Sequence, residues 1–260
     1  MARTPEGPPP PPAVQRLRVH YTKRGRLRFS SHRDFQRAFE RALRRAAVPM
    51  AYSAGFSPHP KVSYANAAPT GTASEAEYLE IALSQQCDPE RLRAALDESL
   101  PPDLDVLEVV QVATHGAPSL TERLQASVWR VRLPGVAYAD ATRAVAAFLA
   151  ADGVEVSRMT KNGLRTFDAR GAVVSLAVSE GRDSDPVGEG QITACAILDV
   201  VVRHVTPAVR PDDVLAGLRH IGELAPREAP GVTRLAQGPL DEITGTVSDP
   251  LAPDRHDVGA

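Results

Sequence analysis

Cysteine and long apolar runs are both scarce in this sequence. Cys87 and Cys195 are its only cysteines, too few for a disulfide framework and too far apart for a local metal motif. No apolar run approaches the ~20 residues of a membrane span, and the N-terminus lacks the apolar core of a signal peptide. The sequence therefore predicts a cytoplasmic protein without a membrane segment.

The common catalytic and cofactor motifs are missing as well. Without a CxxxCxxC motif, the chain cannot itself hold the iron–sulfur cluster of a radical SAM enzyme. It contains no lysine-bearing glycine-rich phosphate loop, no G-x-S-x-G and no H-E-x-x-H. We therefore expect no cofactor and no stoichiometric iron or zinc.

Positive charge is concentrated in one part of the chain. Between Ala13 and Asn66 there are twelve basic residues against two acidic ones, although the formal net charge of the whole protein is -2. The remainder of the chain must therefore be strongly acidic. A basic patch on an acidic body is typical of a protein that binds a polyanion, because phosphate contacts dominate such affinity.

The basic segment contains a well-marked helix. Ser31 is a suitable N-cap and Asp34 completes a capping box, which predicts a helix at about His32 to Ala47. Apolar residues recur at three- and four-residue steps and form one buried stripe. The stripe consists of Phe35, Ala38, Phe39, Ala42, Leu43 and Ala46. The opposite face then carries arginines.

A proline-bracketed histidine follows this helix. Pro58 and Pro60 stiffen the turn around His59, and the aromatic Tyr52 and Phe56 lie close by in sequence. A rigid histidine with aromatics beside an arginine helix suits stacking and phosphate contact with single-stranded RNA. The predicted RNA-binding residues are Lys23, Arg26, Arg28, Arg37, Arg41, Arg44, Arg45, Tyr52, Phe56, His59 and Lys61.

Two segments of this region resemble a known family. Residues 23–45 (KRGRLRFSSHRDFQRAFERALRR) and 52–64 (YSAGFSPHPKVSY), followed by Gly71, Ser74, Glu77 and Tyr78, look like the radical-SAM-associated domain of unknown function. Members occur fused behind a cobalamin-binding radical SAM module or as separate proteins. The separate members are commonly encoded near a ribonuclease of the E/G type. The resemblance thus implies a radical SAM enzyme or such a ribonuclease as a partner in trans.

Three functions remain open at this level. The favoured interpretation is an RNA- or ribonucleoprotein-binding accessory protein, a substrate-recognition partner of a separate enzyme. A metal-independent endoribonuclease is the enzymatic alternative, with His32 and His59 as acid and base, because 2'-OH transesterification needs both roles. The third is a protein-interaction adaptor that docks a radical SAM partner.

The strand and helix pattern predicts an α+β fold of two ferredoxin-like domains in tandem. The first domain, residues 13–114, has the order β-α-β-β-α-β, and a similar order recurs in residues 115–240. One strand is expected over Thr166 to Ser179. Residues 1–12 predict a disordered proline-rich tail, and residues 241–260 a flexible acidic tail.

Overall fold

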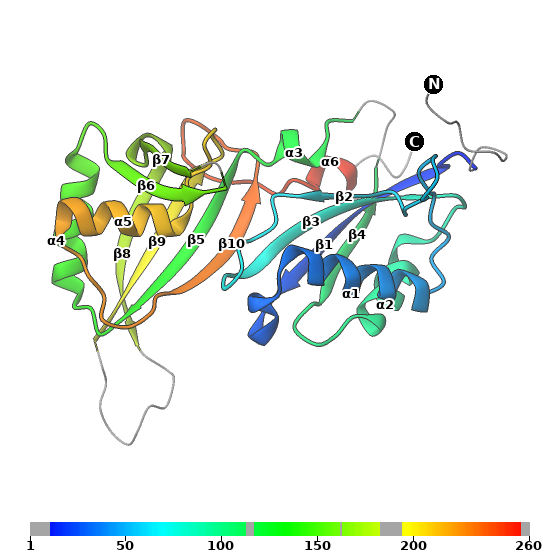
Figure 1. Ribbon diagram of the computed structural model, residues 1–260, viewed down its shortest axis with the longest axis horizontal. Helices are drawn as coiled ribbons and strands as arrows, with labels where there is room; N and C mark the ends of the chain where they lie inside the picture. Colours follow the sequence, from blue (N-terminus) through cyan, green and yellow to red (C-terminus); the bar gives the residue numbers. More distant parts are fainter. Residues whose placement is uncertain (1–10, 113–116, 162, 183–193, 256–260) are drawn as a thin grey trace, which may run out of the picture. The chain divides into compact units, whose positions relative to one another are not determined.

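The computed structural model describes residues 11–112, 117–161, 163–182 and 194–255. Contacts divide the chain into two units, Met1–Arg123 with Pro250–Ala260 and Leu124–Asp249. Each combines helices with antiparallel strands (Figure 1). The chain thus passes between units at Arg123 rather than at residue 114. Most of the expected proline-rich tail, residues 1–10, lies outside the described residues.

The first unit has its two longest helices on one face of an antiparallel sheet (Figure 1). Its elements are β1 (Gln15–Lys23), η1 (Gly25–Phe29), α1 (His32–Arg45), β2 (Val62–Ala65), β3 (Ala73–Leu83), α2 (Pro89–Ser99), β4 (Val106–Gln111), α3 (Leu120–Arg123) and α6 (Ala252–Arg255). The strands pair in the order β4-β1-β3-β2, each pair antiparallel. Leu17 and Val19 of β1 point into the core, so Arg18 between them points to the other face.

The core of this unit confirms the apolar stripe expected for α1. Phe35, Phe39, Ala42 and Leu43 are all buried, and Ala38 and Ala46 are half-buried. Phe35 stacks on Tyr21 of β1, with ring centroids 4.6 Å apart. Burial of one stripe fixes the rotation of the helix, so its arginines must face solvent.

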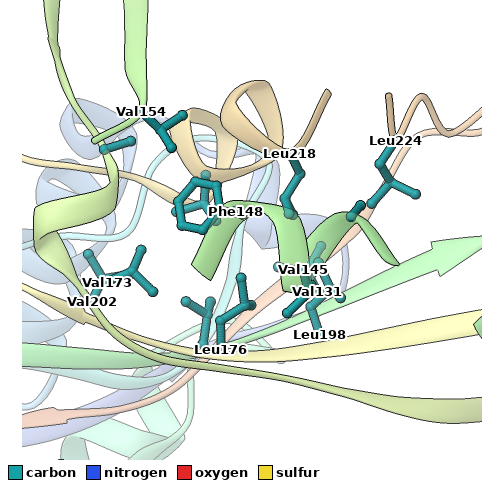
Figure 2. Close-up of a cluster of buried hydrophobic side chains, with 14 of the residues drawn as sticks. Val131, Val145, Phe148, Val154, Val173, Leu176, Leu198, Val202, Leu218 and Leu224 are labelled. Carbon is teal, nitrogen blue, oxygen red and sulfur yellow. The ribbon is translucent and has the colours of Figure 1, made fainter. Parts of the chain in front are cut away.

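The second unit also packs helices on an antiparallel sheet. Its elements are β5 (Ala126–Pro134), α4 (Tyr138–Ala150), β6 (Glu155–Thr160), β7 (Gly163–Asp168), η2 (Arg170–Ala172), β8 (Val173–Arg182), β9 (Ala194–Arg203), α5 (Pro211–Gly222) and β10 (Gly231–Gly238). The strand order is β10-β5-β9-β8, and β6 and β7 form a separate two-stranded sheet. Figure 2 shows Phe148 of α4 and Leu218 of α5 in the core above the strands.

The single strand expected over Thr166 to Ser179 is two strands in the structure. The Asp168 carboxylate accepts hydrogen bonds from the backbone amides of Val154, Arg170 and Gly171, at 2.8 to 2.9 Å. These bonds hold the chain in a turn at the end of β7. A local polar contact thus overrides an apolar pattern that continues through the turn.

The C-terminal segment is folded up to Arg255, in contrast to the flexible tail expected from residue 241. Leu251 and Asp254 are both fully buried. Asp254 accepts hydrogen bonds from the guanidinium groups of Arg18 and Arg123, at 2.8 and 2.7 Å. A buried carboxylate between two arginines holds the segment against the first unit. Residues 256–260 lie outside the described part of the chain.

Candidate nucleic-acid interface

The N-terminus of α1 is fixed by a complete capping box. Ser31 Oγ accepts from the Asp34 amide at 3.2 Å, and the Asp34 carboxylate accepts from the Ser31 amide at 3.3 Å. Hydrogen bonds from the Ser31 side chain and backbone lower the pKa of Asp34, and the charge of Arg37 adds to this effect. Asp34 therefore caps the helix, as the sequence predicts.

The outer face of α1 carries four arginines, Arg37, Arg41, Arg44 and Arg45, which we call the arginine face. All four are exposed. Arg45 donates a hydrogen bond to the carbonyl of Ser99 at 3.5 Å, and none of the four forms an ion pair with a described residue. Asp34 acts on Arg37 only through its charge, so the guanidinium groups of this face have no direct carboxylate contact within the described part of the chain.

Arginines on β1 and directly after it behave differently. Arg16 and Arg18 both pair with Glu80, at 3.0 and 3.1 Å. Arg24 pairs with Glu75 and with Asp105. These three arginines are thus engaged within the fold, whereas the arginines of the arginine face are not.

The short helix η1 leads directly into α1 and extends the basic surface. Arg26 and Arg28 are exposed. The Arg28 guanidinium lies over the ring of Phe29, 4.7 Å from its centroid, and Phe29 itself is 59% exposed. Phe29 is absent from the residues selected by sequence. A phenylalanine in a sequence is more often buried in the core than exposed at a binding surface. The sequence therefore gives little reason to select Phe29, and only the structure shows that it is exposed.

Lys23 does not contribute to this surface, in contrast to its selection from the sequence. Its side chain is buried, with 6% of the residue exposed. Lys23 ends β1, where its backbone pairs with Ser74 of β3. A count of charges along the chain does not distinguish a lysine that points into a sheet from one that points to solvent.

His59 lies close to the base of a hairpin, and backbone contacts hold this base together. Tyr52 and Pro60 form a β-bridge. The Ser53 amide donates to the His59 carbonyl at 2.9 Å, and the His59 amide donates to Ser53 Oγ at 3.1 Å. Because both backbone groups of His59 are engaged, its exposed imidazole is presented from a fixed backbone, as the two flanking prolines predict.

Two open pockets adjoin this hairpin. The first, the α1 pocket, has a volume of about 460 Å³ and lies between α1 and the hairpin; its walls include Glu40, Arg44, Tyr52 and His59. The second, the β2 pocket, has about 500 Å³, and its walls include Ser53, His59, Lys61 and Glu80. His59 and Pro60 line both pockets, so they form a shared wall.

The structure thus brings together part of the predicted site. Arg44, Tyr52 and His59 meet at the α1 pocket, and Lys61 joins His59 at the β2 pocket. Phe56 is 69% exposed but lines neither of these pockets. The remaining arginines lie outside both pockets, on the open surfaces of η1 and α1.

His32 lines neither of the two pockets that adjoin His59. The His32 ring packs edge-on against Tyr64 at 5.1 Å and contacts the Gln36 side chain at 3.0 Å. His32 lies in the first turn of α1, whereas His59 faces Glu40 and Arg44. Eight residues of helix separate His32 from Glu40, a rise of about 12 Å. For RNA cleavage, a general acid and a general base must both lie within hydrogen-bond reach of the reacting groups. These contacts do not bring His32 and His59 together in that way.

The described residues form neither a cluster of metal ligands nor a membrane-spanning helix. Among the described residues, no three His, Cys, Asp or Glu side chains converge as a metal site would require. Cys195 is buried and Cys87 half-buried, with neither in a disulfide. Of the helices in the described ranges, none is both long and apolar enough to cross a bilayer.

Comparison with known proteins gives one family match. A family model described as an uncharacterized protein conserved in bacteria (DUF2344) matches residues 16–211. The curated proteins contain no match to the chain. A crystal structure of an unknown protein from Galdieria sulphuraria is similar with 12% identity and a TM-score of 0.24, over 85% of this chain and 96% of that one. At that TM-score the likeness supports no argument.

Proposed function

This chain belongs to the DUF2344 family of uncharacterized bacterial proteins, and we propose that it binds RNA through the arginine face of α1 and the hairpin that carries His59. The supporting observation is the contrast between the exposed arginines of the arginine face, which form no ion pair with a described residue, and Arg16, Arg18 and Arg24, which are all paired with carboxylates. Like charges on one helix face repel each other, and a polyanion relieves that repulsion.

The aromatic groups favour a single strand over a duplex. Phe29, Tyr52 and Phe56 are 59%, 44% and 69% exposed, all in the basic unit. Unstacked bases pack on such rings, whereas the bases of a duplex are not available to them. The two pockets share His59 and Pro60. We infer that they take successive nucleotides, with the linking phosphate at His59.

We also propose that both units are ferredoxin-like. In the first, β1-α1-β2-β3-α2-β4 folds with strand order β4-β1-β3-β2. In the second, β5-α4-β8-β9-α5-β10 folds with strand order β10-β5-β9-β8, the same relative order, and β6 and β7 are an inserted hairpin. Both sets have the strand succession of the βαββαβ motif.

The proposed RNA surface lies on the helix side of the first unit. RNA-recognition motifs stack bases on the open face of a four-stranded sheet. Here the corresponding face is occupied: Arg18 is fully buried against Asp254, and Arg255 of α6 pairs with Glu108 of β4. The C-terminal segment therefore covers part of the sheet, which leaves α1 and the hairpin as the basic surface.

We propose an accessory role in which the bound RNA is presented to a separate enzyme. The resemblance of residues 23–45 and 52–64 to the radical-SAM-associated domain supports a radical SAM enzyme or an E/G-type ribonuclease as that partner. Purification from native lysate with and without ribonuclease treatment checks this. We expect partners that are lost on treatment, whereas partners that resist it favour a protein-interaction adaptor.

Anisotropy titration of labelled single-stranded RNA over a series of salt concentrations tests RNA binding. We expect Arg37→Gln with Arg41→Gln to weaken binding and to reduce the log–log salt slope by about 0.7 for each lost phosphate contact. Arg143→Gln is the matched control, because Arg143 is an exposed helical arginine of the second unit that pairs with Asp140. No binding at low salt, or equal loss in the control, contradicts the proposal.

A further inference from the structure

We infer that the α1 pocket selects a nucleotide whose base carries an exocyclic amino group, and that Glu40 makes the selection. The inference rests on the proposed RNA binding and adds a base preference to it. The pocket volume of about 460 Å³ lies within the range of small-ligand sites, and its walls include one carboxylate, one guanidinium, one imidazole and one phenol ring. Each group fits a different part of a nucleotide.

Glu40 is the unusual member of this set. Arg37 and Arg44 lie three and four residues away on α1, the spacing at which helical ion pairs form. Nevertheless, Glu40 forms no ion pair with any described residue. Its side chain is half-buried at the pocket wall. Its carboxylate oxygens are therefore not occupied by the neighbouring arginines.

The negative charge of Glu40 also affects the pKa of Tyr64. Burial raises the pKa of Tyr64 well above its usual range, and the negative charge of Glu40 contributes to the rise. Tyr64 is a half-buried residue of β2 that packs edge-on against Phe35. The negative charge of Glu40 is therefore felt on the side of α1 that faces β2 and the hairpin, and not only in open solvent.

A carboxylate in this place distinguishes the two pyrimidines. Ionised Glu only accepts hydrogen bonds. Cytosine presents its N4 amino group as a donor, and Glu is a known acceptor for it, whereas uracil presents the O4 acceptor at the same position and is repelled. Adenine and guanine also carry amino groups, but they differ from pyrimidines in size and stacking. Cytidine against uridine is therefore the cleanest comparison.

The other three groups orient the nucleotide so that its base reaches Glu40. Phosphate is repelled by the Glu40 charge and attracted by Arg44, a pocket wall residue that lies on the arginine face. His59, at the wall shared with the β2 pocket, contacts the phosphate that leads to the next nucleotide. Tyr52 is 44% exposed and offers a ring for stacking of the base.

Anisotropy titration at neutral pH and low salt, with oligocytidylate and oligouridylate of equal length, tests the inference. We expect the wild-type protein to bind oligocytidylate at least about fivefold more tightly, the lower range for one good base contact. In Glu40→Gln the ratio should fall towards one, because the amide both accepts from cytosine and donates to uracil O4. Glu90→Gln removes one exposed carboxylate from α2, outside the pocket, and should keep the wild-type ratio.

The outcomes separate this inference from the proposal on which it rests. Equal, salt-dependent binding of both oligonucleotides by the wild type overturns the base preference but leaves RNA binding intact. A preference that persists unchanged in Glu40→Gln overturns the role of Glu40. No binding of either oligonucleotide at low salt overturns both the inference and the proposed function.

Discussion

Arg18 and Asp254 are 236 residues apart in the sequence, yet they form an ion pair of 2.8 Å with both side chains fully buried. Arg18 also donates from Nε to Glu80 at 3.1 Å, and Arg123 donates to Asp254 at 2.7 Å. The pair thus joins the first strand of the unit to the last helix of the described chain. Removal of Asp254 takes a carboxylate away from two buried guanidinium groups, and Arg123 then has no carboxylate partner among the described residues.

The first prediction concerns this network. We expect Asp254→Ala to lower the free energy of unfolding by about 3–5 kcal/mol, because Arg123 then remains buried without a carboxylate and Arg18 keeps only Glu80. Urea unfolding followed by circular dichroism measures the loss. Glu108→Gln is the control: Glu108 pairs with Arg255 at the surface, so its loss costs at most about 1 kcal/mol. A loss of similar size in both variants would contradict a dominant role for the buried pair.

The second prediction concerns the start of α1. Ser31→Ala removes the acceptor for the Asp34 amide, and we expect a loss of about 1 kcal/mol in the free energy of unfolding. Ser31→Asp keeps an acceptor at the cap and should restore most of this stability. Ser63→Ala, at an exposed position of β2, serves as the control. If Ser31→Ala matches Ser63→Ala, the capping box contributes nothing measurable.

The third prediction concerns the pH dependence of the second unit. His204 Nδ1 donates to the Leu124 carbonyl at 2.6 Å, so Nε2 accepts from the Ser127 hydroxyl at 2.7 Å. Burial lowers the pKa of His204; the Leu124 hydrogen bond opposes this, and the charge of Arg234 adds to it. Because the folded pKa lies below the unfolded value of about 6.5, the unfolded state gains its proton first as pH falls.

Stability is therefore expected to be complete above about pH 6.5 and to decrease as pH falls from there through the folded pKa of His204. Urea midpoints measured at several pH values check this. His204→Gln should remove this part of the dependence, whereas His220→Gln, at an exposed position of α5, should retain it. An unchanged pH slope in His204→Gln would assign the effect to other groups.

The fourth prediction concerns the role of His59. We expect His59→Ala to weaken RNA binding several-fold, on the order of 1 kcal/mol for one hydrogen bond to phosphate. The hairpin should stay folded, because the Ser53 hydrogen bonds involve only the backbone of residue 59 and the β-bridge joins Tyr52 to Pro60. His220→Ala, in the second unit, is the control for loss of an exposed histidine.

The same protein also tests the nuclease alternative. Incubation of the wild type with cellular RNA in EDTA should give no discrete cleavage products, because His32 and His59 are not brought together at either pocket. Products with 2',3'-cyclic phosphate ends that vanish in His32→Ala or His59→Ala would replace RNA binding by endoribonuclease activity as the function.

The helix α1 and its arginine face follow from the sequence because their causes are local. Ser31 and Asp34 are three residues apart and complete the cap between themselves. The apolar stripe through Phe35 and Phe39 fixes which side is buried. Helical geometry then directs Arg41 to solvent regardless of what the stripe packs against. The proline-bracketed turn at His59 is predictable for the same reason.

Only the tertiary structure decides which of these groups meet. Glu40 and His59 share a pocket because the hairpin folds back beside α1, which no spacing in the sequence specifies. Lys23 carries the same charge as its neighbours but is buried at the end of a paired strand. The C-terminal segment is polar, yet Asp254 is held inside by two arginines from distant parts of the chain. Local patterns fix the faces of elements, whereas burial of a charge depends on partners that only the folded chain supplies.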